Sequence, residues 1–166
     1  MRVFAVSGFS FSGKTFLLEQ IIQSLTSEGY KVATIKGSIE DIIAPEGTDT
    51  WRHGNAGASP TILTGPSTTT VRFNRRVSIS EVANVLKVDF LLLEGFKQLE
   101  IPKFWCIGEE SEPIEELPKT VKAVVIWEGT AHKPQIEGIP TISNADIETL
   151  VSIVKNESVG IESVHE

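Results

Sequence analysis

Residues 8–15 read Gly-Phe-Ser-Phe-Ser-Gly-Lys-Thr, which is the pattern Gly-x-x-x-x-Gly-Lys-Thr of a phosphate-binding loop. The two glycines let the backbone bend tightly and approach phosphate oxygens closely. The main-chain N–H groups form an anion nest, to which the start of a following helix adds its positive dipole end. A lysine charge toward the outer phosphates and a threonine hydroxyl on a bridging Mg²⁺ complete such a site. The residues predicted to bind nucleotide here are Gly8, Phe9, Ser10, Phe11, Ser12, Gly13, Lys14, Thr15 and Phe16, with Thr15 also predicted to bind the metal.

A carboxylate, Glu94, follows the most apolar run of the chain, residues 90–93. In an open parallel sheet, ligands bind beyond the carboxyl ends of the strands. A carboxylate at that edge can hold Mg²⁺ through water or orient a water near the γ-phosphate. Glu94 is therefore predicted as a second metal-binding residue and, with Lys14, as a catalytic residue, and Gly95 as part of the nucleotide site. The alternative for Glu94 is a helix-capping or surface carboxylate.

Three further charged residues are candidates for the same edge. Lys36 directly follows a second apolar strand, where it either faces the nucleotide or is a solvated strand end. Asp49 and Arg52 have the i, i+3 spacing of neighbours on a helix surface, so they could simply pair with one another. They could equally project a carboxylate and a guanidinium toward a nucleotide or pterin phosphate. The sequence leaves both alternatives open.

The pattern of apolar residues predicts the elements that position these side chains. A buried strand at 3–7, the loop, a helix ending near Gly29 and a strand at 31–35 form a βαβ unit with a right-handed crossover. The stretch 36–57 predicts a long, partly helical connection. Strands are also predicted at 61–64 and 69–73, as a hairpin, and at 90–93, 104–107, 121–127 and 141–143, with helices over 78–87 and from 143 or 144 to about 155.

This order predicts an α/β protein with a P-loop NTPase fold: three layers α/β/α, a mostly parallel sheet and an inserted β-hairpin. A single nucleotide-binding domain is expected over residues 1–156, with a mobile polar tail at 157–166. Among 166 residues the net charge is −7, which argues against capture of nucleic acid or an anionic membrane. The single cysteine, Cys106, lies in an apolar run and predicts a buried, inert sulfur. We expect a cytoplasmic protein, because no signal core or membrane-length apolar stretch is present.

Several of these motifs, taken together, resemble the MobB family of molybdopterin-guanine dinucleotide biosynthesis adapter proteins. The matching segments follow one another in the family's order over roughly residues 2–155. The Glu-Gly-Phe-Lys segment and the Asp-Thr-x-Arg segment with Ala-Gly-Ala carry more of the specificity than the loop does. The segments are residues 8–15, 33–36, 49–52, 56–58 and 93–97, followed by Pro102 and Lys103.

The resemblance implies a homodimeric GTP-binding protein with at most slow GTP hydrolysis and with Mg²⁺ as the cofactor of GTP. Such proteins assist a guanylyltransferase-type partner enzyme that attaches GMP to molybdenum or tungsten pterin. Carried onto this chain, the resemblance implies that Lys14 and Thr15 bind phosphate and Mg²⁺. It also implies that the same pocket is lined by Lys36, Asp49, Arg52 and Glu94. Whether molybdopterin itself contacts the chain is left open.

Two positions depart from the family pattern. Members commonly continue the second strand as Ile-Lys-His, whereas Lys36 is followed here by Gly37. The strand near residue 126 ends in Trp127, where a polar residue beside the base is expected. No Asn-Lys-x-Asp guanine signature is present, and residues 144–146, Asn-Ala-Asp, serve either as a weak substitute or as a helix cap. The guanine preference therefore rests on the resemblance.

The alternative function is a P-loop small-molecule kinase, a phosphotransferase on the same fold. Kinases usually add an arginine-bearing lid over the transferred phosphate, and this chain has no obvious lid insertion. A remnant that no longer binds nucleotide has little support, because every position of the loop motif is intact. The accessory role is favoured. The arginines of the chain are Arg2, Arg52, Arg72, Arg75 and Arg76.

Overall fold

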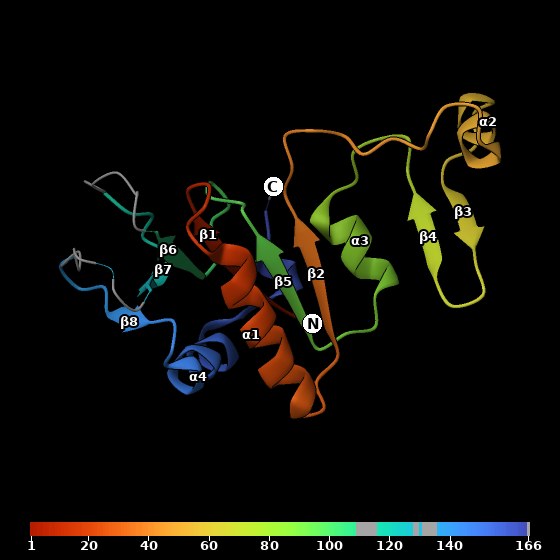
Figure 1. Ribbon diagram of the computed structural model, residues 1–166. Coiled ribbons are helices and arrows are strands. Elements are labelled where there is room, and N and C mark those ends of the chain that lie inside the picture. The colour runs from red at the N-terminus through yellow and green to blue at the C-terminus, as the bar shows by residue number, and fades with distance from the viewer. Residues whose placement is uncertain (109–115, 128–129, 131–135, 166) are drawn as a thin grey trace. The chain divides into compact units, whose positions relative to one another are not determined.

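The computed structural model describes residues 1–108, 116–127, 130 and 136–165, and they form two compact units (Figure 1). The first unit comprises Met1–Gly37 and Ile79–Glu166, and the second comprises Ser38–Ser78. The second unit coincides with the long connection and the hairpin that the sequence predicts between the second strand and the 78–87 helix. Each unit is described below by itself.

A seven-stranded sheet forms the centre of the first unit. Its strands run in the order β2-β5-β1-β6-β7-β8 and are parallel, and only the short strand β9 pairs antiparallel to β1. The most central strands are continuous apolar runs because both of their faces are covered. The bounds are β1 Arg2–Gly8, β2 Val32–Lys36, β5 Phe90–Glu94, β6 Lys103–Ile107, β7 Val121–Ile126, β8 Thr141–Ser143 and β9 Val159–Gly160.

Helices cover both faces of this sheet. Helices α1 (Lys14–Ser27) and α4 (Ile147–Glu157) pack on the face that carries Phe4 and Val6. Helix α3 (Ile79–Val85) and the short 3₁₀ helix η1 (Ile161–Ser163) belong to the opposite face. The predicted three-layer α/β/α fold is confirmed. None of the described helices reaches the length and apolarity that a lipid bilayer demands.

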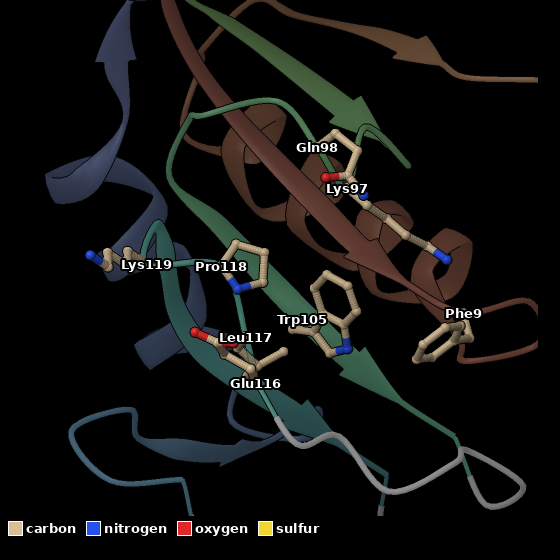
Figure 2. A pocket seen from close by; sticks show the side chains of 8 residues that line it. All are labelled: Phe9, Lys97, Gln98, Trp105, Glu116, Leu117, Pro118 and Lys119. Carbon is tan, nitrogen blue, oxygen red and sulfur yellow. The ribbon is translucent and has the colours of Figure 1, made fainter.

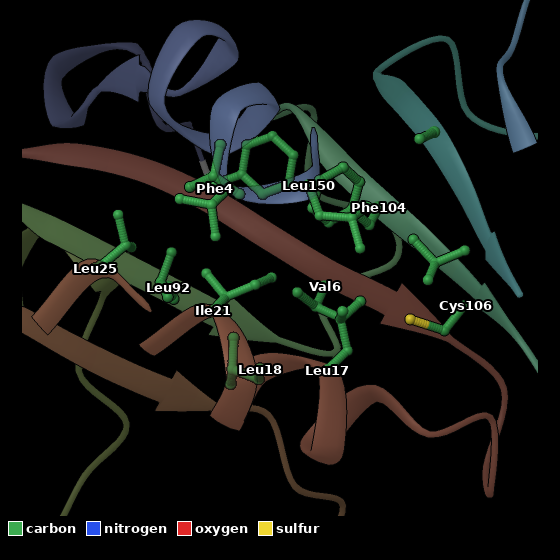
Figure 3. Close-up of a cluster of buried hydrophobic side chains, with 14 of the residues drawn as sticks. Phe4, Val6, Leu17, Leu18, Ile21, Leu25, Leu92, Phe104, Cys106 and Leu150 are labelled. Carbon is green, nitrogen blue, oxygen red and sulfur yellow. The ribbon is translucent and has the colours of Figure 1, made fainter. Parts of the chain in front are cut away.

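The largest core cluster lies between the sheet and helices α1 and α4 (Figure 3). The rings of Phe4 and Phe104 meet edge to face with centroids 4.7 Å apart. Helix α1 contributes residues spaced three and four apart, so that they share one face of the helix. The α1 residues that are buried in this way are Leu17, Leu18, Ile21 and Leu25.

The second unit contains helix α2 (Asp49–Asn55) and a two-stranded antiparallel sheet of β3 (Thr61–Thr64) and β4 (Thr69–Arg72). The predicted hairpin is confirmed, with Ile62 opposite Val71. Apolar side chains of the hairpin remain exposed within the described chain, among them Ile62, Leu63 and Val71.

The carboxyl-terminal residues differ from the mobile tail that the sequence predicts from residue 157. Val159 pairs with Val3 through β9, and Val164 is only 6% exposed in the cluster that contains Val3 and Leu91. The tail alternates these few apolar residues with polar ones, so its composition resembles that of a solvated segment. Only the tertiary structure reveals the sheet surface against which these apolar side chains are buried.

Burial predicts how two valine truncations differ. Val125 is fully buried between the layers, whereas Val85 is 74% exposed. Val125→Ala should lower the free energy of unfolding by about 2 kcal/mol, because it removes buried methyl groups and leaves a cavity. Val85→Ala should change it by less than about 0.5 kcal/mol. Urea denaturation of both variants measures this, and equal losses would contradict the described core.

Candidate functional site

The predicted phosphate loop lies at the carboxyl end of β1, between β5 and β6, and leads into α1 at Lys14. Both motif glycines have positive φ, 143° at Gly8 and 78° at Gly13. A Cβ on Gly8 would lie 2.5 Å from the carbonyl oxygen of Cys106, and one on Gly13 would lie 1.7 Å from the ring of Trp127. These two glycines are therefore required by the backbone conformation and by their neighbours.

Trp127, directly after β7, is a site residue that sequence reasoning missed. Its indole Nε1–H donates a hydrogen bond of 3.0 Å to the carbonyl of Ser12, and its ring meets that of Phe16 edge to face at 5.5 Å. The family pattern leads one to expect a polar residue near the base at this strand end, and Trp127 departs from it. The indole instead supports the loop from the side on which α1 begins. The sequence offered one signal for this role, a tryptophan at the carboxyl end of a predicted parallel strand, where site residues gather.

The Lys14 ammonium folds back across the loop. It donates to the carbonyl of Phe9 and lies 3.4 Å from the hydroxyl oxygen of Ser12, which itself donates to the Phe9 carbonyl at 2.9 Å. Burial lowers the pKa of Lys14, and the negative charge of Glu94 is among the groups that oppose this shift. The loop thus brings one full positive charge to the end of β1.

Cys106 lies beside the loop on β6, paired in register with Gly8. It is fully buried, and burial raises the pKa of its thiol to about 12. The prediction of a buried sulfur is confirmed. At neutral pH this thiol stays protonated and is a poor nucleophile.

Glu94 ends β5 and gathers two of the other predicted residues. One of its carboxylate oxygens, Oε1, accepts a 2.8 Å hydrogen bond from the Thr15 hydroxyl and lies 3.1 Å from the Lys36 ammonium. Parallel pairing explains why these three side chains lie close together, since Glu94 is in register with Val6 of β1 and with Lys36 of β2. Glu94 is 7% exposed, so it is not a surface carboxylate.

The oxygens of Thr15 and Glu94 fit a magnesium ion. Mg²⁺ prefers hard oxygen ligands about 2.0–2.1 Å away in an octahedron, which puts neighbouring ligand oxygens about 2.9 Å apart. The Thr15 hydroxyl and the Glu94 carboxylate are oxygen donors separated by 2.8 Å. A cation between the loop and β5 would also counter the negative charge of Glu94. The donor set therefore suits the metal that the loop motif predicts.

Lys103, the first residue of β6, is a second residue whose role the sequence did not reveal. Its side chain is fully buried, and its ammonium donates to the carbonyls of Phe96 at 3.1 Å, Lys97 at 2.9 Å and Leu99 at 2.5 Å. Burial lowers the pKa of Lys103 to about 8, against the opposing charge of Glu100. Three donors meet three carbonyls, so Lys103 holds the segment that follows Glu94 in one conformation.

The other predicted charged residues belong to the second unit or to the start of α4. Asp49 and Arg52 are in the first and last turns of α2, in the second unit, where their charges complement the helix dipole. Their role in the nucleotide pocket stays a prediction. Asp146 caps α4, since its carboxylate accepts a 3.2 Å hydrogen bond from the N–H of Thr149. The cap interpretation of residues 144–146 is therefore confirmed, but the capping residue is Asp146 and the helix begins at Ile147, later than the start at 143 or 144 that the sequence predicts.

The other predicted site residues are either exposed or hold neighbouring strand ends together. Gly95 follows Glu94 with φ of 101°, and its carbonyl accepts a hydrogen bond from the Ser7 hydroxyl of β1. Phe11 is fully exposed although its φ is 59°, an uncommon value for a residue with a side chain. Ser10 is also exposed, and Phe9 and Phe16 are about half-exposed.

The sheet order, the loop after β1 and the helix that begins at its lysine define a P-loop NTPase-type α/β protein. The family model described as molybdopterin guanine dinucleotide synthesis protein B matches residues 3–127. The chain belongs to this family, MobB.

Individual relatives agree with this assignment. A molybdopterin-guanine dinucleotide biosynthesis adapter protein of Haemophilus influenzae is 35% identical over 126 residues, 72% of this chain and 71% of that protein. A relative from Methanocaldococcus jannaschii with the same adapter description is 41% identical over 118 residues, 66% of this chain, and the match spans about half of that protein, 49%. The crystal structure of Bacillus subtilis MobB superimposes with a TM-score of 0.74 at 25% identity, covering 96% of this chain and 99% of that one.

The shifted pKa of Lys103 predicts a pH dependence of stability. The folded-state value of about 8 lies below the ordinary 10.5, so between these values the unfolded chain holds a proton that the folded chain has released. Raising the pH through this window should therefore raise the free energy of unfolding of the natural chain relative to Lys103→Met. Both chains share every other titrating group, so urea denaturation from about pH 7 to about pH 11 isolates Lys103. A difference that stays constant with pH would contradict the shift.

Proposed function

We propose that this protein is a GTP-binding adapter that assists the formation of molybdopterin guanine dinucleotide. The observation that carries the proposal is the contact between the loop and β5, where the Thr15 hydroxyl meets Glu94 beside Lys14 and Lys36. Membership in the MobB family supports the biosynthetic role, since curated relatives are named adapter proteins of this pathway. The same membership favours the adapter over a small-molecule kinase.

In this proposal the loop amides and the Lys14 ammonium bind the β- and γ-phosphates of GTP. Thr15 and Glu94 hold Mg²⁺, which neutralises phosphate charge when bound. Lys36 lies beside Glu94 and adds positive charge at the same edge. The positive φ at Gly8 and Gly13 allows the tight loop backbone that a nest of N–H groups around a phosphate requires. Binding and orientation would thus be supplied by the loop after β1, the start of α1 and the carboxyl ends of β5 and β2.

Hydrolysis of GTP should be slow. An arginine near the γ-phosphate typically accelerates this reaction by several powers of ten. Arg2 is the only arginine in the sequence of the first unit, and it starts β1, at the edge of the sheet away from the loop. A guanidinium would have to come from the second unit, where Arg52 lies, or from a partner protein. This is the behaviour of an adapter whose nucleotide state is read by another enzyme.

The proposed partners are a second copy of this chain and a guanylyltransferase-type enzyme. Exposed apolar side chains support a protein interface on the second unit. In the hairpin, Ile62 is 60%, Leu63 58% and Val71 50% exposed. A soluble monomer normally keeps such side chains scattered, whereas Ile62 and Val71 are cross-strand neighbours. We assign this hairpin surface to the homodimer.

Removal of the loop cation tests nucleotide binding. With GTP and Mg²⁺ at about 100 times the dissociation constant, binding should add about 2.7 kcal/mol to the stability of the natural chain, a melting shift of roughly 5 to 10 °C. Lys14→Ala should abolish the shift without unfolding the ligand-free protein. Lys122→Ala is the matched control, since Lys122 pairs with Glu157 on the surface. An unchanged shift in Lys14→Ala would reject the site, and ATP in place of GTP tests base preference.

Neutralising Glu94 tests the metal assignment separately. Glu94→Gln keeps an oxygen that can accept from Thr15 but removes the charge that Mg²⁺ contacts. The gain in GTP affinity on adding Mg²⁺ should fall by about tenfold, because a charged ligand is lost. Calorimetric titration with and without Mg²⁺ measures this gain, and Glu157→Gln is the control. If Glu94→Gln responds to Mg²⁺ like the natural chain, Glu94 does not hold the metal.

A further inference from the structure

A pocket of about 550 Å³ opens beside the phosphate loop and is not used by the proposed nucleotide site (Figure 2). Pockets of this size suit small-molecule ligands. The wall nearest the loop is the ring of Phe9, and the segment after β5 and the residues before β7 form the other walls. Its main lining residues are Phe9, Lys97, Gln98, Trp105, Leu117 and Pro118.

The pocket lies on the face of the sheet opposite α1. Along β6, side chains alternate between the two faces. Phe104 and Cys106 belong to the cluster beneath α1, whereas Trp105 belongs to a separate cluster with Leu117. A nucleotide held by the start of α1 therefore approaches from one face, and a ligand against Trp105 approaches from the other.

Aromatic rings, the lysines Lys97 and Lys119 and the carboxylate of Glu116 line the pocket, and Lys97 is the cation beside the rings. The rings of Phe9 and Trp105 meet edge to face with centroids 5.9 Å apart and an interplanar angle of 82°. The Lys97 ammonium lies 4.3 Å from the centre of the Phe9 ring. Figure 2 shows Lys97 extending toward Phe9, while the ammonium of Lys119 points away from the rings. A planar ring can pack against these faces, and Lys97 can pair with an anionic group on it.

The wall that carries Lys97 is held rigidly. The carbonyls of Phe96, Lys97 and Leu99 each accept a hydrogen bond from the fully buried Lys103 ammonium. Burying a charge is costly unless its donors are satisfied, and here all three are used on one short segment. The backbone of Lys97 and Gln98 is thereby presented to the pocket in a single conformation, as a preorganised binding site requires.

We propose that this pocket binds a planar heteroaromatic ring that carries a phosphate monoester, the chemistry shared by a phosphorylated pterin and a nucleoside monophosphate. The ring packs on Phe9, which is 40% exposed, and touches the small part of Trp105 that reaches the pocket, since that residue is 6% exposed. The phosphate pairs with Lys97. The inference deepens the proposed function and rests on it, because it assigns a second ligand to the opposite side of the same loop. Phe9 then joins the two sites, since its carbonyl contacts Lys14 and its ring lines the pocket.

Neopterin monophosphate, which is fluorescent, is the probe for this site. It is titrated with the full chain by fluorescence anisotropy, with GTP and Mg²⁺ saturating so that the phosphate loop is occupied. The natural chain should bind it, and Lys97→Gln should bind it about tenfold more weakly, because one charge-assisted contact is lost. Trp105→Phe should also weaken binding, since part of the ring surface is removed. Lys155→Gln, at the far end of α4, should bind like the natural chain.

Two comparisons define the ligand. Neopterin without its phosphate should bind more weakly to the natural chain and should not distinguish it from Lys97→Gln. GMP, which is not fluorescent, is titrated as a competitor that displaces the bound neopterin monophosphate and so separates the sources: tighter GMP binding that depends on Lys97 would support the site and assign it to a nucleotide. Equal affinity of the natural chain and Lys97→Gln for both phosphates, or no binding of either, would overturn the proposal. The GTP melting shift, measured on the same samples, reports separately on the proposed function.

Discussion

The loop after β1 keeps its shape because its neighbours leave no room for side chains at Gly8 and Gly13. The Cys106 carbonyl closes one position and the Trp127 ring closes the other. With the backbone confined in this way, α1 begins at Lys14 and the next residue, Thr15, reaches Glu94. Glu94 and Cys106 come from β5 and β6, which pair with β1 on either side, and Trp127 follows β7, which pairs with β6. The charged site, with the Thr15 and Glu94 oxygens that we propose to hold Mg²⁺, follows from this packing arrangement.

A buried ammonium organises the other half of the site. Lys103 is removed from water, and the cost is offset because each of its three hydrogens meets a main-chain carbonyl. The segment it holds begins just after Glu94, so the carboxylate and the wall of the second pocket are fixed together. One side of the loop carries the charges of Lys14, Glu94 and Lys36, and the other carries the ring of Phe9 with the Lys97 ammonium over it. The two ligands that we propose would therefore lie on different sides of one loop.

Local patterns predicted most of the elements. Apolar runs and helical spacing indicated the strands of the central sheet and helices α1 and α4, and the order of elements predicted the three-layer fold. The hairpin was predicted from two β-prone runs around Gly65-Pro66. The approach of Lys36 and Glu94 followed from the rule that parallel strands present their carboxyl ends at one edge. The short strand β9 and the burial of Val164 were missed, because two or three apolar residues in a polar tail carry no periodic signal.

The sequence by itself determined the loop, the positions at which charges follow buried strands and the alternation of elements, because these depend on neighbouring residues along the chain. Only the tertiary structure decided that Trp127 supports the loop, that Lys103 holds the segment after Glu94, and that Phe9 faces Trp105. Each of those contacts joins residues from different segments of the chain, which the sheet brings together. In the sequence, a lysine or tryptophan in an apolar run looks the same whether it supports a site or only fills the core. The packing of the folded chain is what distinguishes these two roles.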